Sequence, residues 1–303
     1  MKKLKIVSIC VFILSAILFG GFIAKEKIAK DSTSPVITMD SDSIAVSIND
    51  GREALLRGVT ASDAGDGDIT ASVHVESVGP MNEKGERKVS YVAFDSDGNV
   101  SHALRTMTYT DYTAPVLTLS RNLAYPAGTT NLVDGFTAQD CWGQDLTSEI
   151  RVLFTESKNV RLAGFYPARV KVIDSTGGSF ELPVNYEIYV AQAYNKLPAL
   201  TLDNYLLYIN KGEPFNALDH LNNVTINGAK YTPVEEDGTY GVVEEYEKGQ
   251  ERTIDLNRFT ISGDVDTNTP GCYEVSVSLE DSVFETGTGT VRMYVVVKEG
   301  GTE

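Results

Sequence analysis

The chain has 303 residues and a formal net charge of −16, and 42% of its residues are hydrophobic. This length predicts two or three domains. Outside the first 30 residues the chain holds 20 basic and 41 acidic side chains. Because an acidic surface repels nucleic acid and anionic lipid, we expect no nucleic-acid partner.

The N-terminal segment differs from the rest of the chain. Lys2, Lys3 and Lys5 precede an apolar run at residues 6–24 that contains no charged side chain. About 20 apolar residues span a bilayer as a helix, so this run predicts a transmembrane signal anchor. Residues 1–5 then form a cytoplasmic stub and 25–33 a stem, and the bulk of the chain is extracytoplasmic in a single-pass membrane protein. The alternative is a cleaved signal peptide and a secreted product.

Beyond the stem, the chain repeats itself. Six residues of the first copy recur 77 positions later in the second: Gly58, Thr60, Ala61, Asp63, Asp68 and Thr70 correspond to Gly135, Thr137, Ala138, Asp140, Asp145 and Thr147. A repeat of roughly 80 residues is long enough to bury its own core. We therefore predict domains at 34–112 and 113–191.

A third, divergent copy follows at 197–299. It opens with "PALTL" and closes with "GCYEVSVSLEDS" and "VRMYVVVKE". It lacks the acidic loop of the first two copies and carries an insertion near residues 219–254. Apolar and polar residues alternate in short runs in all three copies, and turn-forming residues separate these runs. The pattern predicts an all-β chain of tandem, seven-strand Greek-key β-sandwiches of the immunoglobulin type.

The repeated motifs resemble a known family. The segments "GVTASDAGDGDIT" and "GFTAQDCWGQDLT", and the later "VSYVAFDSDGN", are similar to the bacterial immunoglobulin-like domains found in Gram-positive surface proteins and appended to certain pesticidal crystal proteins. The resemblance covers residues 34–190 well and 198–298 in part. It implies an Ig-like fold and a role as spacer or binding module, and it assigns no activity.

The acidic loops are the candidate metal site. Calcium prefers six to eight oxygen ligands, many of them carboxylates, and loops at one end of a sandwich can bring these together. The alternative is that the Asp residues form turns and cap backbone N–H groups. The candidate calcium ligands are Asp63, Asp66, Asp68, Asp95, Asp97, Asp111, Asp140, Asp145 and Asp174.

Four aromatic residues are candidate ligand contacts. Trp142, the only Trp, lies in the acidic loop of the second copy, and Tyr231, Tyr240 and Tyr246 lie in the acidic insertion of the third. An exposed aromatic ring can stack on a sugar or anchor a protein partner. The alternative is that these rings pack on their own domains.

The sequence contains no recognisable nucleophile elbow, zinc motif or phosphate loop, and we expect no enzymatic activity and no cofactor other than the candidate calcium. We predict a membrane-anchored, extracellular, non-catalytic spacer or adhesion module. Two alternatives remain. One is a glycan- or protein-binding module that uses the third domain, and the other is an accessory subunit of an envelope enzyme.

Overall fold

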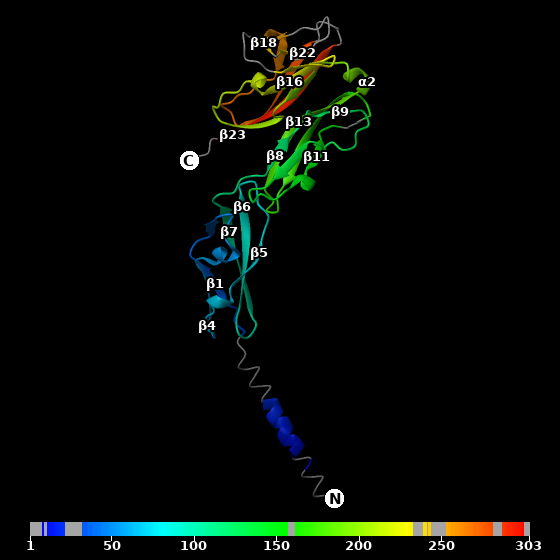
Figure 1. Cartoon of the computed structure of the whole chain (residues 1–303). Helices are drawn as coiled ribbons and strands as arrows, with labels where there is room; N and C mark the ends of the chain where they lie inside the picture. The colour runs from blue at the N-terminus through cyan, green and yellow to red at the C-terminus, as the bar shows by residue number, and fades with distance from the viewer. Residues whose placement is uncertain are drawn as a thin grey trace. The chain divides into compact units, whose positions relative to one another are not determined.

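A computed structural model describes residues 8, 11–21, 32–156, 161–232, 239–240, 242–243, 253–280 and 287–299. The chain divides into two compact units, Met1–Tyr112 and Thr113–Glu303. Both units consist of β-sheets (Figure 1), which confirms the predicted all-β sandwich architecture. The short helix α2 (Ala191–Tyr194) lies in the second unit.

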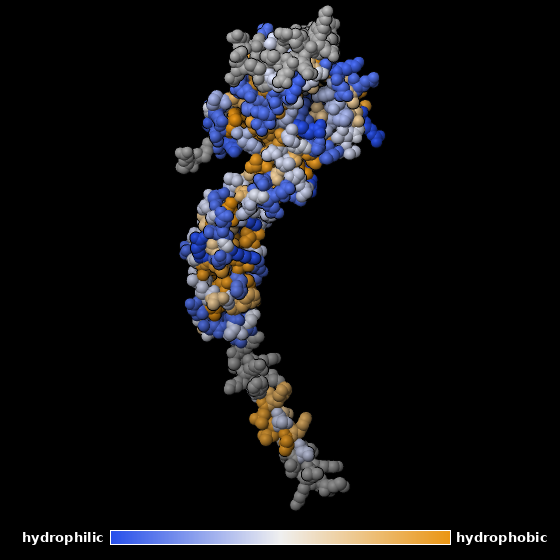
Figure 2. Space-filling model, in the orientation of Figure 1, coloured by the Kyte–Doolittle hydropathy of each residue, from blue (hydrophilic) through white to orange (hydrophobic). Residues whose placement is uncertain are grey.

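Only part of the expected anchor belongs to the described residues. Ser8 and residues 11–21 are helical, and the remainder of 6–24 lies outside the described residues. The described helical residues form the isolated apolar segment near the N-terminus in Figure 2. Within the part of the chain that the structure describes, no helix has both the length and the apolar character needed to cross a bilayer.

The first unit holds one sandwich. Its sheets have the strand orders β1-β3-β4 and β2-β7-β6-β5. Two 3₁₀ turns, η1 (Arg52–Leu56) and η2 (Thr70–Ser72), connect strands across the two sheets. The strands are β1 (Val36–Met39), β2 (Ser43–Val46), β3 (Val59–Asp63), β4 (Gly67–Asp68), β5 (His74–Val78), β6 (Glu86–Phe94) and β7 (Val100–Tyr109).

The second unit begins with a sandwich of the same kind, which we call domain 2. Its sheets are β10-β8 and β11-β12-β13-β9. The 3₁₀ turn η3 (Thr147–Glu149) occupies the place that η2 has in the first sandwich. The strands are β8 (Val116–Leu119), β9 (Ala124–Pro126), β10 (Phe136–Gln139), β11 (Arg151–Phe154), β12 (Gly164–Ile173) and β13 (Ser179–Tyr189).

The third sandwich, domain 3, completes the second unit. Its main sheets are β14-β16-β17-β19 and β15-β23-β22-β21, and β18 pairs with β20. The 3₁₀ turns are η4 (Ala217–His220) and η5 (Leu256–Arg258). The strands are β14 (Ala199–Leu202), β15 (Leu206–Asn210), β16 (Leu221–Ile226), β17 (Ala229–Thr232), β18 (Thr239–Tyr240), β19 (Val242–Val243), β20 (Ile254–Asp255), β21 (Phe259–Ser262), β22 (Gly271–Glu280) and β23 (Thr288–Lys298).

One topological feature relates all three sandwiches. The opening segment of each is split, so that its first half pairs antiparallel in one sheet and its second half pairs parallel with the last strand of the other sheet. The parallel pairs are β2 with β7, β9 with β13, and β15 with β23. The divergent third copy therefore shares the topology of the first two, although it lacks their acidic loop.

Domain 3 closes an open strand edge of domain 2. In its two-stranded sheet, β8 pairs only with β10, which leaves its other edge without a strand. The hydroxyl of Tyr208 in β15 accepts a hydrogen bond from the main-chain N–H of Leu117 in β8 (3.1 Å) and donates one to the carbonyl of the same residue (3.0 Å). The tyrosine thus pairs with both main-chain groups, as a neighbouring strand would.

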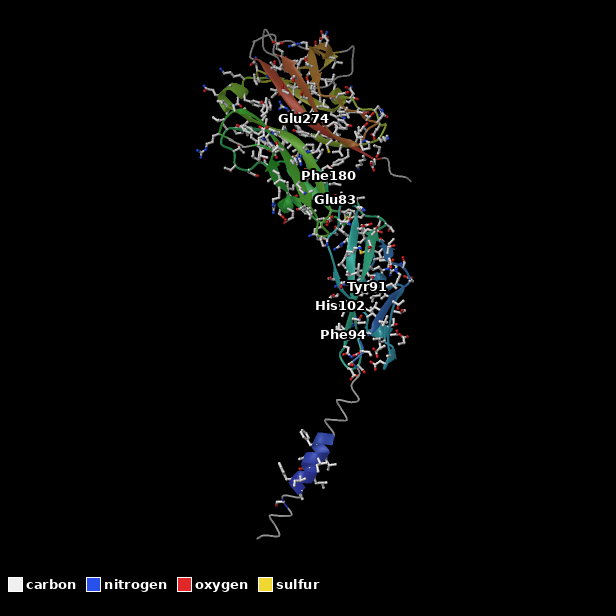
Figure 3. All side chains as sticks on the ribbon, turned by 180° about the vertical axis from the view of Figure 1, so that it is seen from behind. Glu83, Tyr91, Phe94, His102, Phe180 and Glu274 are labelled. Carbon is white, nitrogen blue, oxygen red and sulfur yellow. The ribbon has the colours of Figure 1, made fainter. Side chains whose placement is uncertain are left out.

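A second tyrosine does the same at β13. The hydroxyl of Tyr294 in β23 accepts from the main-chain N–H of Asn185 (3.1 Å) and donates to its carbonyl (3.3 Å). The Asn185 side chain in turn donates from Nδ2 to Oε2 of Glu274 (2.8 Å), a residue labelled in Figure 3. Burial raises the pKa of Tyr294, so its hydroxyl keeps its proton at neutral pH.

An arginine completes this contact. Arg292 in β23 donates from Nη1 to Oε2 of Glu187 in β13 (2.7 Å), and its side chain is only 12% exposed. Its guanidinium also lies 4.5 Å from the ring centroid of Phe165 in β12. The buried cores of domains 2 and 3 form one cluster, whereas the first sandwich has a core of its own. We expected each repeat to bury its own core, but the second and third copies share one.

The tyrosine contacts predict that domains 2 and 3 unfold together. Removing one hydroxyl in Tyr294→Phe leaves the N–H and carbonyl of Asn185 buried without partners, which should destabilise the unit by about 1–3 kcal/mol. Trp142, the only Trp of the chain, lies in domain 2, so its fluorescence in a urea titration reports the unfolding of that domain.

The matched control is Tyr273→Phe. The Tyr273 hydroxyl donates to the carbonyl of Thr269 at an exposed position within domain 3. Its loss should leave the midpoint reported by Trp142 nearly unchanged. Equal effects of the two variants on this midpoint would contradict the proposed coupling.

Candidate functional site

The two acidic loops that recur in the first and second copies have the same construction. Asp63 ends β3, and its Oδ2 accepts from the N–H groups of Gly65 (2.7 Å) and Asp66 (3.2 Å). Asp140 follows β10, and its Oδ1 accepts from the N–H groups of Trp142 and Gln144. Each carboxylate is more than 90% buried. These residues therefore fold the loops by capping backbone donors.

The Asp-x-Thr part of the motif has an equally local role. Asp68 accepts from both the N–H and the hydroxyl of Thr70, and these bonds lower the pKa of Asp68 below its ordinary 3.8. Thr147 lowers the pKa of Asp145 in the same way. The two threonine hydroxyls also accept from the N–H groups of Ala61 and Ala138. The repeated spacing therefore fastens each loop to the strand before it.

In the first sandwich, the acidic turn between β6 and β7 lies against the β3–β4 loop. Asp66 accepts from the N–H of Ser96 (2.7 Å) and from its hydroxyl (2.8 Å), which joins the β3–β4 loop to the β6–β7 turn. Asp95 in that turn is buried, which opposes its ionisation. The hydrogen bonds from Asn99, Asp97 and Gly98 nevertheless hold its pKa below the ordinary value. Asp97 thus contributes its backbone N–H to this turn.

In domain 2, Asp174 holds the corresponding turn. Its Oδ1 accepts from the N–H and hydroxyl of Thr176 and from the N–H of Gly178. Asp140 and Asp174 both lie near the thiol of Cys141. Burial raises the pKa of that thiol most strongly, and the two carboxylates raise it further.

Asp111, another candidate calcium ligand, forms its hydrogen bonds with the first sandwich. Its Oδ2 accepts from the hydroxyl of Ser47 (2.6 Å) and its Oδ1 from the N–H of Ile48 (2.7 Å), both in the first sandwich. These bonds lower the pKa of Asp111, with the Ser47 hydroxyl as the largest cause. Asp111 therefore ends the first sandwich by binding the chain that follows β2.

Two carboxylate oxygens stand apart from this network. Oδ1 of Asp63 and Oδ2 of Asp140 are buried and have no hydrogen-bond partner in the structure. They occupy equivalent positions of two repeats, and a buried carboxylate oxygen without a partner is unfavourable. Among the described residues, no three or more His, Cys, Asp or Glu side chains are grouped so that they could hold a metal ion. Calcium binding stays a prediction, and these two oxygens are the atoms that fit it best.

The aromatic candidates fall in different environments. Trp142 is 39% exposed, whereas Tyr231 is 2% exposed and pairs with Val224 and Val243 inside the sheet of domain 3. Tyr231 is therefore a core residue, and its prediction as a surface contact was wrong. Tyr240 lies in β18, but its side chain is outside the described residues, as is Tyr246.

An aromatic pocket that the sequence did not suggest lies on domain 2. It has a volume of about 440 Å³ and is bounded by the end of β13, the start of β12 and helix α2. We call it the Phe165 pocket. The rings of Tyr189 and Tyr194 stack against each other in its wall, with centroids 3.8 Å apart. Its lining residues are Ala163, Gly164, Phe165, Glu187, Ile188, Tyr189, Val190, Ala193, Tyr194 and Leu197.

Phe165 is the exposed element of this pocket. Its side chain is 60% exposed, and neighbouring Leu162 and Val190 are similarly exposed. The Arg292 guanidinium lies over the Phe165 ring, and Glu187 binds that guanidinium. The ring is thus held in position by domain 3 while most of its surface faces solvent. A rigid, exposed aromatic ring beside a carboxylate can bind an apolar or sugar-like ligand face.

A signal for this arrangement was present in the sequence. Residues 293–297 form the uninterrupted apolar run "MYVVV", and all five are buried. Such a run is typical of a strand that is covered on both faces. A strictly alternating strand pattern would leave Tyr294 and Val296 exposed, so alternation alone does not predict the packing of domain 3 against domain 2.

No family model matches this chain, and no curated protein matches it. Among solved structures, a Clostridium perfringens ZmpB catalytic domain with its two CBM51 domains aligns at 13% identity over 89% of this chain and 31% of that chain, with a TM-score of 0.23. This chain thus spans about a third of that structure. The extracellular cadherin domains 1–5 of protocadherin gamma B2 align at 13% identity over 88% and 60% of the two chains, with a TM-score of 0.21. A lipoprotein from Bacteroides thetaiotaomicron aligns at 12% identity over 59% and 98%, with a TM-score of 0.22. Similarity at this level assigns neither a family nor a ligand.

Calcium titration tests the acidic loops. An ion bound by the unpartnered oxygen of Asp140 should raise the urea midpoint reported by Trp142, and Asp140→Asn should abolish the rise because it removes the charge while keeping the shape. Asp134→Asn, which changes an exposed carboxylate of the same domain, is the control. If millimolar calcium leaves the wild-type midpoint unchanged, the loop carboxylates of domain 2 act as turn caps alone.

Proposed function

We propose that this chain is a non-catalytic, membrane-anchored surface module that carries its C-terminal two-domain unit outside the cell and binds a partner there. The apolar run at residues 6–24 supports the anchor, because it has the length and composition of a membrane-spanning helix. The acidic, sandwich-forming remainder suits an extracytoplasmic location.

The observation that carries the binding role is the Phe165 pocket. Exposed aromatic rings normally lose rotamer freedom when a ligand immobilises them, which weakens binding. Phe165 is already held by Arg292, and Arg292 is itself bound to Glu187. The Phe165 ring is therefore already ordered before a partner binds, so binding loses little side-chain entropy at this residue. We assign the partner contact to this pocket; in the insertion of domain 3, the candidate Tyr231 is buried.

Two classes of partner fit this pocket, and a glycan is one of them. Sugar rings stack on flat aromatic faces, and carboxylates accept hydrogen bonds from sugar hydroxyls. The exposed Phe165 ring and the adjacent Glu187 present this combination in one pocket. A protein partner would use the same ring as an apolar anchor together with exposed Leu162 and Val190.

Protease treatment of intact producing cells tests the anchor and its orientation. We expect proteinase K to degrade the domains recognised by an antibody against residues 32–303, because these residues lie outside the membrane. A chain in which Leu14 and Leu18 are both changed to Arg should be lost from the membrane fraction, since each charge in the span is costly. Full protection of the domains in intact cells would contradict the proposed location.

Binding of the labelled full chain to envelopes of the producing organism tests the pocket. We expect Phe165→Ala to weaken binding by about tenfold or more, as truncation of an aromatic anchor does. Leu153→Ala is the control, because Leu153 is a 50% exposed apolar residue of the same domain outside the pocket. Binding lost after periodate treatment of the envelopes indicates a glycan, and binding lost after protease treatment indicates a protein. Equal binding by wild type and Phe165→Ala would contradict the assignment.

A further inference from the structure

The first sandwich contains a charged pocket that plays no part in the binding role proposed above. It has a volume of about 420 Å³, within the range of small-molecule sites. Its apolar wall includes the buried side chains of Val46, Leu55 and Met107. Arg52 and Arg87 also line it, and we call it the Arg52–Arg87 pocket.

Both arginines are held in place by main-chain carbonyls. Arg87 donates from Nε to the carbonyl of Gly79 (2.7 Å) and from Nη1 to the hydroxyl of Tyr109 (3.0 Å). Arg52 donates from Nη2 to the carbonyls of Val75 (3.0 Å) and Glu76 (3.2 Å). Each guanidinium therefore retains N–H donors that these bonds do not use.

Neither guanidinium forms an ion pair with a carboxylate of the described residues. The chain carries 42 acidic and 26 basic side chains, so acidic partners are abundant. Arg57, Arg105, Arg121, Arg151, Arg169 and Arg292 all have one. Two preorganised and unneutralised guanidiniums on the edge of an apolar pocket form a complementary site for an anion.

The second copy shows that the fold does not require these arginines. The 79-residue offset that relates Gly85 to Gly164 places Tyr166 at the position of Arg87. The offset of 77 that relates the acidic loops places Thr129 at the position of Arg52. The two domains thus build the same sandwich with different side chains at these positions.

The same comparison explains the cavity. In the first sandwich Tyr91, labelled in Figure 3, donates its hydroxyl hydrogen to the carbonyl of Leu55, a pocket residue. In domain 2 the carbonyl of Leu132, at the position of Leu55, accepts instead from Tyr186 of β13, which the 79-residue offset places at Met107. There, the ring centroids of Tyr125 and Phe154 lie 5.9 and 5.6 Å from that of Tyr186. The strand registers place the pocket residues Val46, Val78 and Met107 at the positions of Tyr125, Phe154 and Tyr186, so the first sandwich has smaller side chains where domain 2 has three rings.

Asp50 adds a third recognition element. It lines the pocket, and its Oδ2 accepts from the N–H of Ser47 and from Arg57. A carboxylate near two arginines disfavours a purely anionic ligand and favours one that also carries an N–H donor. An apolar body, a carboxylate and an N–H group occur together in the C-terminal end of a peptide.

We propose that the Arg52–Arg87 pocket binds the free C-terminus of a peptide with apolar end residues. The terminal carboxylate lies between the two guanidiniums, the apolar side chains contact Val46, Leu55 and Met107, and a peptide N–H donates to Asp50. The pocket belongs to the first sandwich, so this site and the Phe165 pocket of domain 2 can be tested separately.

Calorimetric titration of the full chain in detergent micelles with N-acetyl-divaline tests the proposal. We expect binding at millimolar peptide or below. Its C-terminal amide should bind about tenfold or more weakly, because the charge-assisted bonds to arginine are lost. Octanoate, which has a carboxylate and an apolar body but no N–H, should also bind more weakly than the peptide.

The variants Arg87→Tyr and Arg52→Thr introduce the residues that domain 2 carries, and each should weaken peptide binding about tenfold. Arg169→Gln, which removes a surface arginine of domain 2, should bind as wild type. Absence of heat with wild type, equal binding of the peptide and its amide, or undiminished binding by Arg87→Tyr would each overturn the site. Tighter binding of octanoate would overturn the assignment to a peptide. The comparison of peptide and amide uses wild type alone, so it holds even where a variant fails to fold.

Discussion

The unpaired main-chain groups of strands β8 and β13 determine how the C-terminal unit is built. A strand edge must find partners for its N–H and carbonyl groups, either in water or in protein. Domain 3 supplies these partners with two tyrosine hydroxyls, from Tyr208 and Tyr294, each of which both donates and accepts. Burial raises the pKa of Tyr208 to about 12, so this hydroxyl keeps the proton that it donates. Two repeats thereby become one compact unit.

The packing of domain 3 against domain 2 positions the side chains of the Phe165 pocket. Arg292 comes from domain 3, whereas Phe165 and Glu187 come from domain 2, and the Arg292 guanidinium contacts both. A stiff arrangement of this kind is what a surface module needs when it presents an aromatic ring to a partner. The first sandwich has a core of its own. Its open end instead provides the Arg52–Arg87 pocket.

The acidic motif shows how one repeat can carry both structural and candidate ligand chemistry. Each of its carboxylates caps at least one backbone N–H group, which explains why the spacing recurs so closely in two copies. Asp63 and Asp140 each use only one oxygen in this way and leave the other buried and unpartnered. The repeated turn therefore accounts for nearly all of the motif, and these two oxygens are the part that it does not explain.

The sequence alone predicted the all-β class, the repeat and the split between the first two copies. These features follow from local patterns, because strand alternation, Gly-containing turns and Asp-x-Thr caps act over short stretches of chain. The conformation of Gly58 and Gly135 illustrates this, since both have positive φ values of 70° and 91°, where other residues are strained. The sequence also located the acidic loops that meet through Asp66 and Ser96. Only the tertiary structure decided that Tyr231 is buried, that domains 2 and 3 share a core, and that Phe165 and Arg292 lie together. The last two outcomes depend on contacts between residues about 90 to 130 positions apart. The apolar run at 293–297 indicates a strand covered on both faces, but it does not say which residues will cover it.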